Sequence, residues 1–88
     1  MTSTAFLARV YISLKPTVND PAGNTIQGAL DNLGYATTSV RSGKFFKVVV
    51  NAESAELAQA QVEEMCKRLL ANPVIETYEV EVEPVPAA

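Results

Sequence analysis

The sequence predicts a small α+β domain in which a four-stranded antiparallel sheet carries two helices on one face. Three observations support this fold class. Segments with a period of two alternate with segments of helical period, Gly or Pro lies near most of the boundaries, and the order strand-helix-strand occurs twice. The chain has 88 residues, which is the length of one domain.

The first strand and the first helix are predicted in the N-terminal third. Apolar and other side chains alternate from Ala5 to Leu14, as in a half-buried strand. Asp20-Pro21 is a typical helix start, because Asp caps free backbone N–H groups and Pro suits the first helical position. Apolar residues repeat at helical spacing as far as Leu33, and Gly34 follows as a stop signal.

A β-hairpin is predicted in the middle of the chain. Thr37 to Arg41 is expected to form the second strand and Lys44 to Asn51 the third. Ser42-Gly43 lies between these two segments and is typical of a tight turn.

The last third of the chain predicts a second helix and a fourth strand. Ser54 is expected to cap the helix, which runs to about Ala71 and is ended by Asn72-Pro73. Val74 to Glu83 alternates as a strand. The Pro- and Ala-rich residues 84–88 are expected to form a disordered tail, so the domain should cover residues 1–83.

This order of elements, βαββαβ, is that of the ferredoxin-like sandwich. Right-handed crossovers would place strands one and three in the centre of the sheet and strands four and two at its edges. The face opposite the helices would carry both apolar and charged side chains: Leu7, Tyr11, Phe45, Val49, Arg9, Lys47, Glu79 and Glu81. Such a face predicts a partner surface, although single exposed apolar side chains are ordinary.

No residue pattern points to catalysis. The sequence has no histidine, the commonest general base and transition-metal ligand. Its one cysteine, Cys66, lies on the apolar stripe of the second helix, which predicts a buried structural thiol. The acids Glu79, Glu81 and Glu83 alternate on a predicted edge strand, where they discourage edge pairing; a site for a hard cation is the alternative.

Charge and hydropathy exclude other classes of protein. The net charge is −3, and the 7 basic residues are scattered, which argues against nucleic-acid binding. The longest apolar stretch is far shorter than the roughly 20 residues of a membrane span. The N-terminus has no features of a signal peptide, and a single cysteine suits a reducing compartment. A cytoplasmic location is therefore expected, without nucleic-acid or membrane partners.

Particular strings resemble one protein family. They are Val10–Pro16 before an Asp-Pro-x-Gly helix start at Asp20–Gly23, the A-L-x-x-L-G-Y run Ala29–Tyr35, the V-R-x-G-K segment Val40–Lys44, and the M-C-x-x-L-L-A-N-P-V-I-E segment Met65–Glu76. Together they cover residues 7–83 in order. By these strings the chain is similar to the PurS family, the small subunit of phosphoribosylformylglycinamidine synthase.

The resemblance implies a non-catalytic subunit of a glutamine- and ATP-dependent ligase in the fourth step of purine biosynthesis. In the family, a synthetase subunit (PurL) binds ATP and magnesium, and a glutaminase subunit (PurQ) releases ammonia. PurS associates with itself, joins the two and helps ammonia to pass. This chain is therefore expected to bind no cofactor and to form a homodimer or tetramer. The alternative is a ferredoxin-like regulatory domain that senses a small molecule.

The expected subunit contacts fall in three places. They are the open face (Tyr11, Phe45), the hairpin (Arg41, Gly43, Lys44) and the segment after the second helix (Asn72, Pro73, Glu76). Arg41 offers a planar fork for an anion and Lys44 a mobile point charge. Neither has an acidic neighbour within the hairpin, so contact with another subunit is favoured. The alternative is that both basic residues are only solvated.

Overall fold

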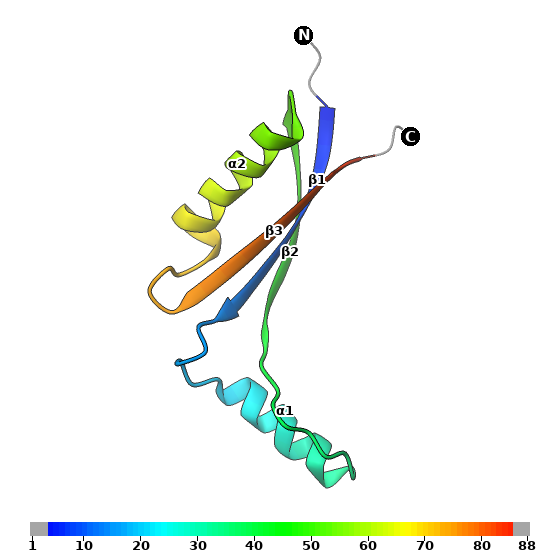
Figure 1. Ribbon diagram of the computed structural model, residues 1–88, viewed down its shortest axis with the longest axis vertical. Coiled ribbons are helices and arrows are strands. Elements are labelled where there is room, and N and C mark those ends of the chain that lie inside the picture. The colour runs from blue at the N-terminus through cyan, green and yellow to red at the C-terminus, as the bar shows by residue number, and fades with distance from the viewer. Residues whose placement is uncertain (1–3, 86–88) are drawn as a thin grey trace.

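The computed structural model describes residues 4–85. The elements, in chain order, are β1 (Thr4–Leu14), α1 (Pro21–Asn32), β2 (Gly43–Ala52), α2 (Ala55–Met65), the π-helical turn η1 (Cys66–Leu70) and β3 (Glu76–Pro84). The strands form a three-stranded antiparallel sheet in the order β2-β1-β3. α2 covers one face of this sheet, whereas α1 lies beyond one end of it (Figure 1). Over residues 4–85 the fold is thus α+β, with two α-helices, one π-helical turn and three strands.

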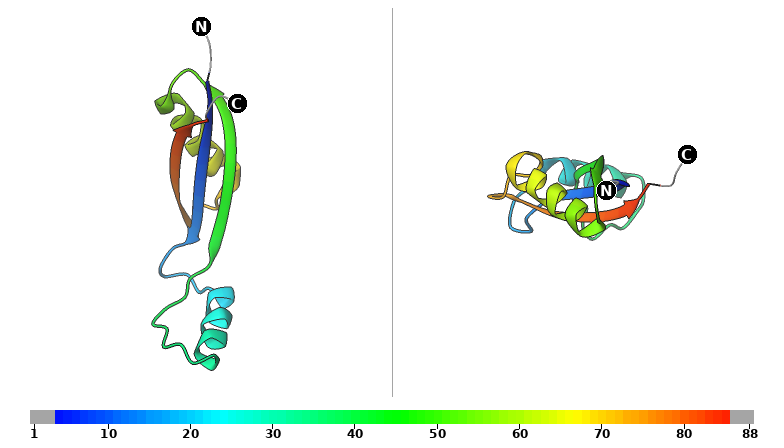
Figure 2. Two further views of the ribbon diagram at one scale, coloured as in Figure 1. Left: turned by 90° about the vertical axis from the view of Figure 1, so that its right-hand side faces the viewer. Right: turned by 90° about the horizontal axis from the view of Figure 1, so that it is seen from above.

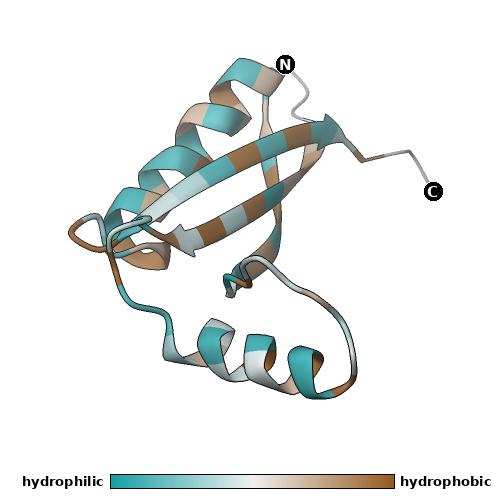
Figure 3. Cartoon of the chain, turned by 60° about the horizontal axis from the view of Figure 1, so that its bottom comes forward, coloured by the Kyte–Doolittle hydropathy of each residue, from teal (hydrophilic) through white to brown (hydrophobic). Residues whose placement is uncertain are grey.

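The core lies between β1 and α2. Apolar and polar residues alternate along the strands (Figure 3), because successive side chains of a strand point to opposite faces. On β1 the four inward side chains are 5% exposed or less: Phe6, Ala8, Val10 and Ile12. Three side chains of the second helix, all completely buried, pack on them: Ala58, Val62 and Cys66. The predicted half-buried first strand is confirmed.

The predicted helix boundaries are confirmed by their caps. The Asp20 carboxylate accepts the Gly23 N–H at 3.0 Å, and the Ser54 hydroxyl accepts the Leu57 N–H at 3.2 Å. Gly34 has a φ of 101°, which ends the turn after α1 in the left-handed region that favours glycine. The last turn of the second helix widens to π geometry, with the Ala71 N–H bonded to the Cys66 carbonyl at 2.9 Å.

The predicted second strand at Thr37 to Arg41 is wrong, and so is the hairpin turn at Ser42-Gly43. Residues 35–42 pair with no strand in the described part of the chain, and Gly43 is already the first residue of β2. Gly43 does not adopt positive φ. A Cβ atom there would lie 2.5 Å from the Ile12 carbonyl oxygen, so glycine permits close approach of β2 to β1. The segment that follows α1 therefore leads into β2 without forming a strand or a hairpin of its own.

The prediction that both helices cover one face of the sheet is wrong for α1. The described chain is elongated (Figure 2), with extents of 56 × 32 × 15 Å along its principal axes. Its radius of gyration is 16.8 Å, whereas a compact domain of this length has a value of about 12 Å. The apolar stripe predicted on α1 is consequently left partly exposed, with Ile26 46% and Leu33 73% accessible.

Two further features concern the end of the chain and its hydropathy. Pro84 is the last residue of β3, and the Val85 N–H donates to the Ala5 carbonyl at 2.9 Å. The tail expected from residue 84 therefore does not include these two residues, and residues 86–88 lie outside the described residues.

None of the helices between residues 4 and 85 has the length and hydropathy needed to cross a membrane.

Candidate functional site

The sheet face opposite α2 carries the mixed surface predicted from the sequence. The register places Tyr11 of β1 beside Phe45 of β2 and Glu79 of β3. The Tyr11 and Phe45 rings stack with their centroids 5.2 Å apart, and they are 39% and 50% exposed. Val49, further along β2, is 62% exposed. The two aromatic candidates therefore form one accessible apolar group.

Charged groups on this face are partly paired within the chain. Arg9 forms an ion pair with Glu83 at 2.5 Å, and the Tyr11 hydroxyl donates to Glu81 at 3.0 Å. The Glu81 hydrogen bond raises the pKa of Tyr11, and the Glu83 hydrogen bond raises the pKa of Arg9. Among residues 4–85, no three or more acids, cysteines or histidines are grouped to hold a metal ion. Two of the three alternating acids thus have protein partners.

A second group of candidates meets at the end of the sheet nearest α1. Lys44 Nζ lies 3.4 Å from Glu76 Oε2, and Glu76 Oε1 accepts the Asn72 N–H at 2.7 Å. The Asn72 N–H lowers the pKa of Glu76, with a smaller contribution from Lys44. The Asn72 side chain accepts the Val74 N–H at 3.0 Å, which fixes the turn around Pro73. Lys44 thus has an acidic partner after all, from a strand outside the expected hairpin.

Arg41 bonds to backbone carbonyls and not to the side chains of this group. Its Nη2 donates to the Lys15 carbonyl at 3.0 Å and to the Val18 carbonyl at 2.8 Å. It thereby ties the segment that returns from α1 to the segment that leaves β1. The expected contact residues therefore form two groups. One is the aromatic pair, and the other lies at one end of the sheet and consists of the Lys44–Glu76 group with Arg41 and Gly43 beside it.

A buried carboxylate lies where α1 joins the sheet, and it was predicted only as a helix cap. Asp20 is 2% exposed and accepts the Ser42 N–H at 2.6 Å in addition to the Gly23 N–H. The Ser42 hydroxyl also donates to it, at 2.9 Å. The backbone N–H groups of Gly23 and then Ser42 are the main causes that lower the pKa of Asp20. Ser42 was missed because it could be interpreted only as part of a turn.

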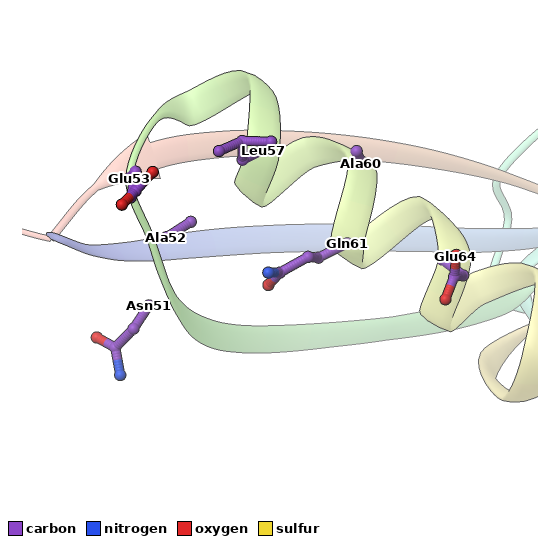
Figure 4. A pocket seen from close by; sticks show the side chains of 7 residues that line it. All are labelled: Asn51, Ala52, Glu53, Leu57, Ala60, Gln61 and Glu64. Carbon is purple, nitrogen blue, oxygen red and sulfur yellow. The ribbon is translucent and has the colours of Figure 1, made fainter. Parts of the chain in front are cut away.

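A groove between α2 and β2 was also missed. One part, of about 470 Å³, is lined by Leu57 and Ala60 of α2 and by Ala52 at the end of β2 (Figure 4). A second part, of about 520 Å³, is lined by Val48, Met65, Arg68, Leu69 and Leu70. The two parts share Gln61 and Glu64, so they lie next to each other along α2. The groove exists because α2 packs most closely on β3 and no second helix lies beside it.

The thiol predicted to be structural is confirmed as part of the core. Cys66 is completely buried, and burial raises its pKa, so the nucleophilic thiolate is disfavoured.

Comparison with known proteins identifies the family. Residues 7–84 match the family model PurS, phosphoribosylformylglycinamidine (FGAM) synthase. The phosphoribosylformylglycinamidine synthase subunit PurS of Methanocaldococcus jannaschii is 44% identical over 81 residues, which are 91% of this chain and 98% of that protein.

Solved structures agree in fold. The PurS subunit of Thermotoga maritima is 33% identical with a TM-score of 0.88, covering 94% of this chain and 97% of that one. A chain of the T. maritima PurLQS structure is 35% identical with a TM-score of 0.84, covering 90% of this chain and 98% of that one. With the family model, the close relative and these structures in agreement, the chain belongs to the PurS family of phosphoribosylformylglycinamidine synthase subunits.

Proposed function

We propose that this chain is the non-catalytic assembly subunit of a phosphoribosylformylglycinamidine synthase complex. It joins a synthetase subunit, PurL, to a glutaminase subunit, PurQ, and supports the transfer of ammonia between them. The observation that carries this proposal is the likeness to a chain of the T. maritima PurLQS structure over 90% of its length. The alternative of a small-molecule sensor is not favoured, since the family model and the curated relatives belong to the synthase.

The division of labour follows from this assignment. ATP and magnesium bind to the large partner subunit, and this chain binds no cofactor of its own. The complex acts in the cytoplasm on glutamine and phosphoribosylformylglycinamide. The absence of histidine from the sequence and the burial of Cys66 support an assembly role.

Co-purification tests the assembly role. A tagged glutaminase subunit is expected to retain the synthetase subunit on an affinity column only when this chain is present. The amount of synthetase retained should rise with added chain and then level off. The control omits the glutaminase and shows that the synthetase does not bind to the column alone. Equal retention of the synthetase with and without this chain would contradict the bridging role.

Self-association forms part of the proposal and explains the incomplete sheet. α1 has no extensive contact with the strands of its own sheet, and the stripe residues Ile26 and Leu33 are exposed. The groove beside α2 lies where the ferredoxin-like sandwich has its other helix. α1 has 12 residues, a length of about 18 Å, which suits a groove running along an 11-residue helix.

Two copies can satisfy both surfaces by exchanging α1. Each α1 would lie in the groove of the other copy, and the segment after it would lie beside the free edge of that copy's β2. Each half would then have two helices over one sheet face, as the four-stranded ferredoxin-like prediction requires. Such an exchange is symmetric, so it closes at two copies. The homodimer is its minimal form, and a tetramer would use a further surface.

The remaining surfaces are proposed for the other subunits. One is the aromatic group of Tyr11 and Phe45. The other is the polar end of the sheet nearest α1, with Arg41, Gly43, Lys44, Asn72, Pro73 and Glu76. The two surfaces differ in character, since the first is apolar and the second is already hydrogen-bonded. Covering the exposed apolar area of the aromatic group removes it from water, which contributes favourable free energy to binding.

Phe45→Glu tests the aromatic surface. The substitution leaves the core intact, because Phe45 is 50% exposed and lies on the face away from α2. It is expected to weaken assembly with the partner subunits at least about tenfold, since a charge would have to be desolvated where a ring now stands. Binding isotherms at physiological salt measure the effect. Ala55→Glu places the same charge on exposed backbone at the start of α2 and serves as the control. Equal affinity of both variants would remove the aromatic group from the interface.

A further inference from the structure

Two connections join α1 to the sheet, and side chains bond them to each other. Residues 15–20 lead from β1 to α1, and residues 33–42 lead from α1 to β2. Asp20, at the end of the first connection, accepts both the N–H and the hydroxyl of Ser42, at the end of the second. Arg41 donates to the Lys15 and Val18 carbonyls across the same gap. The base of α1 is therefore bonded across both connections.

The backbone of α1 is also pressed against the returning segment at this point. Gly23, in the first turn, is buried, and a Cβ atom there would lie 2.4 Å from the Val40 carbonyl oxygen. That oxygen belongs to the backbone, so it cannot swing aside as a side chain would. Gly28, in the same helix, has nothing within 4 Å of its Cβ position. Of the two glycines in α1, only the one at the base of the helix is approached this closely by the backbone.

A helix cap alone does not require these contacts. The Asp20–Gly23 hydrogen bond satisfies the cap. The bonds to Ser42 connect segments 22 residues apart and hold a buried carboxylate, whose pKa is lowered mainly by backbone N–H groups and less by Arg41. α1 has no extensive contact with the strands, so the contacts at its base can set the direction of the helix.

We propose that Asp20, Ser42 and Gly23 form a latch that holds α1 pointing away from its own sheet and so positions it for a second copy. This inference rests on the proposed exchange of α1 between two copies. While the latch is closed, the chain passes straight from residue 42 into β2 and α1 cannot fold back over its own groove. Asp20 and Ser42 are therefore positioning residues for assembly.

The latch predicts that freeing α1 weakens assembly without unfolding the sheet. A helix that samples many directions is competent only for the fraction of time it points correctly, and the apparent dissociation constant rises by the inverse of that fraction. If a released α1 points correctly about a tenth of the time, self-association weakens about tenfold.

The test compares Gly23→Ala with Gly28→Ala in the full chain. Ala favours a helix over Gly at both positions, so a role in helix stability alone predicts equal or tighter association for both. The latch predicts that only Gly23→Ala loses protection of the Ser42 amide from hydrogen exchange and self-associates at least about tenfold more weakly in sedimentation equilibrium. Amides of β1 are expected to keep their protection in both variants.

A second variant keeps the test decisive if Gly23→Ala does not fold. Ser42→Ala removes the hydroxyl bond and leaves the Asp20–Gly23 cap, and Ser42→Thr restores the hydroxyl. The expected order of association is wild type and Ser42→Thr above Ser42→Ala. A wild-type Ser42 amide without protection, or association unchanged in Gly23→Ala and Ser42→Ala, would overturn the latch. The wild type could instead stay monomeric while its Ser42 amide is protected and that protection is lost in Gly23→Ala. This result would refute the exchange and would still support the latch, as contacts that fix the direction of α1.

Discussion

Omitting this chain from a mixture of the synthetase and glutaminase subunits is expected to reduce glutamine-dependent amidine formation at least about a hundredfold, because a bridging subunit turns ammonia delivery into a step within one assembly. Without the bridge, ammonia released by the glutaminase is diluted into solvent before it reaches the synthetase. Turnover measured with glutamine, ATP, magnesium and phosphoribosylformylglycinamide, with and without this chain, gives the ratio directly.

An external nitrogen source provides the matched control. With ammonium chloride in place of glutamine, the synthetase is expected to turn over at a similar rate whether or not this chain is present, since this chain is proposed to supply no catalytic group. The chain alone is expected to show no glutaminase or ATPase activity. The assembly role is falsified if the glutamine-dependent rate does not depend on this chain.

The local elements could be predicted because their causes are local. The alternation from Ala5 to Leu14 identifies β1 and its core side chains. Asp20 and Ser54 mark both helix starts through side-chain caps three residues from their partners. Each of these effects acts within one turn or one pleat, so a single sequence shows it.

The position of α1 could not be predicted in this way. Thr37 to Arg41 is rich in β-branched residues, which favours a strand, but a strand also needs a neighbour with which to pair. Asp20 and Arg41 instead bind groups far along the chain, and these bonds lead residue 42 directly into β2. Such contacts have no period and no fixed spacing, so the sequence does not show them.

The candidate surfaces divide along the same line. Tyr11 and Phe45 were placed together correctly because the period of two fixes the face of each strand. The Lys44–Glu76 pair depends on the alignment of strands that do not pair with each other, and it was missed. The groove beside α2 exists because α1 does not cover that face. The predicted fold placed α1 there, so no groove was predicted.

Ile26→Glu is expected to convert the self-associated form into a monomer while the monomer keeps almost all its stability. In the single chain Ile26 is 46% exposed on a helix without extensive contact with the strands, so a carboxylate there stays in water. In the exchanged arrangement the same position lies in the apolar groove of the second copy. Burying an unpaired charge there costs roughly 3–5 kcal/mol, which weakens association about a hundredfold to a few thousandfold.

Gly28→Glu is the matched control, because it adds the same charge to the same helix on the side opposite Ile26 and has nothing within 4 Å to displace. It is expected to keep the wild-type oligomer. Sedimentation equilibrium gives the association constant of each variant, and thermal unfolding of dilute samples gives the stability of the monomer. Dissociation of Ile26→Glu alone supports the exchange of α1. Equal dissociation of both variants would assign the effect to charge on the helix, and an unchanged oligomer in both would place the contact between copies on another surface, the open sheet face being the next to test.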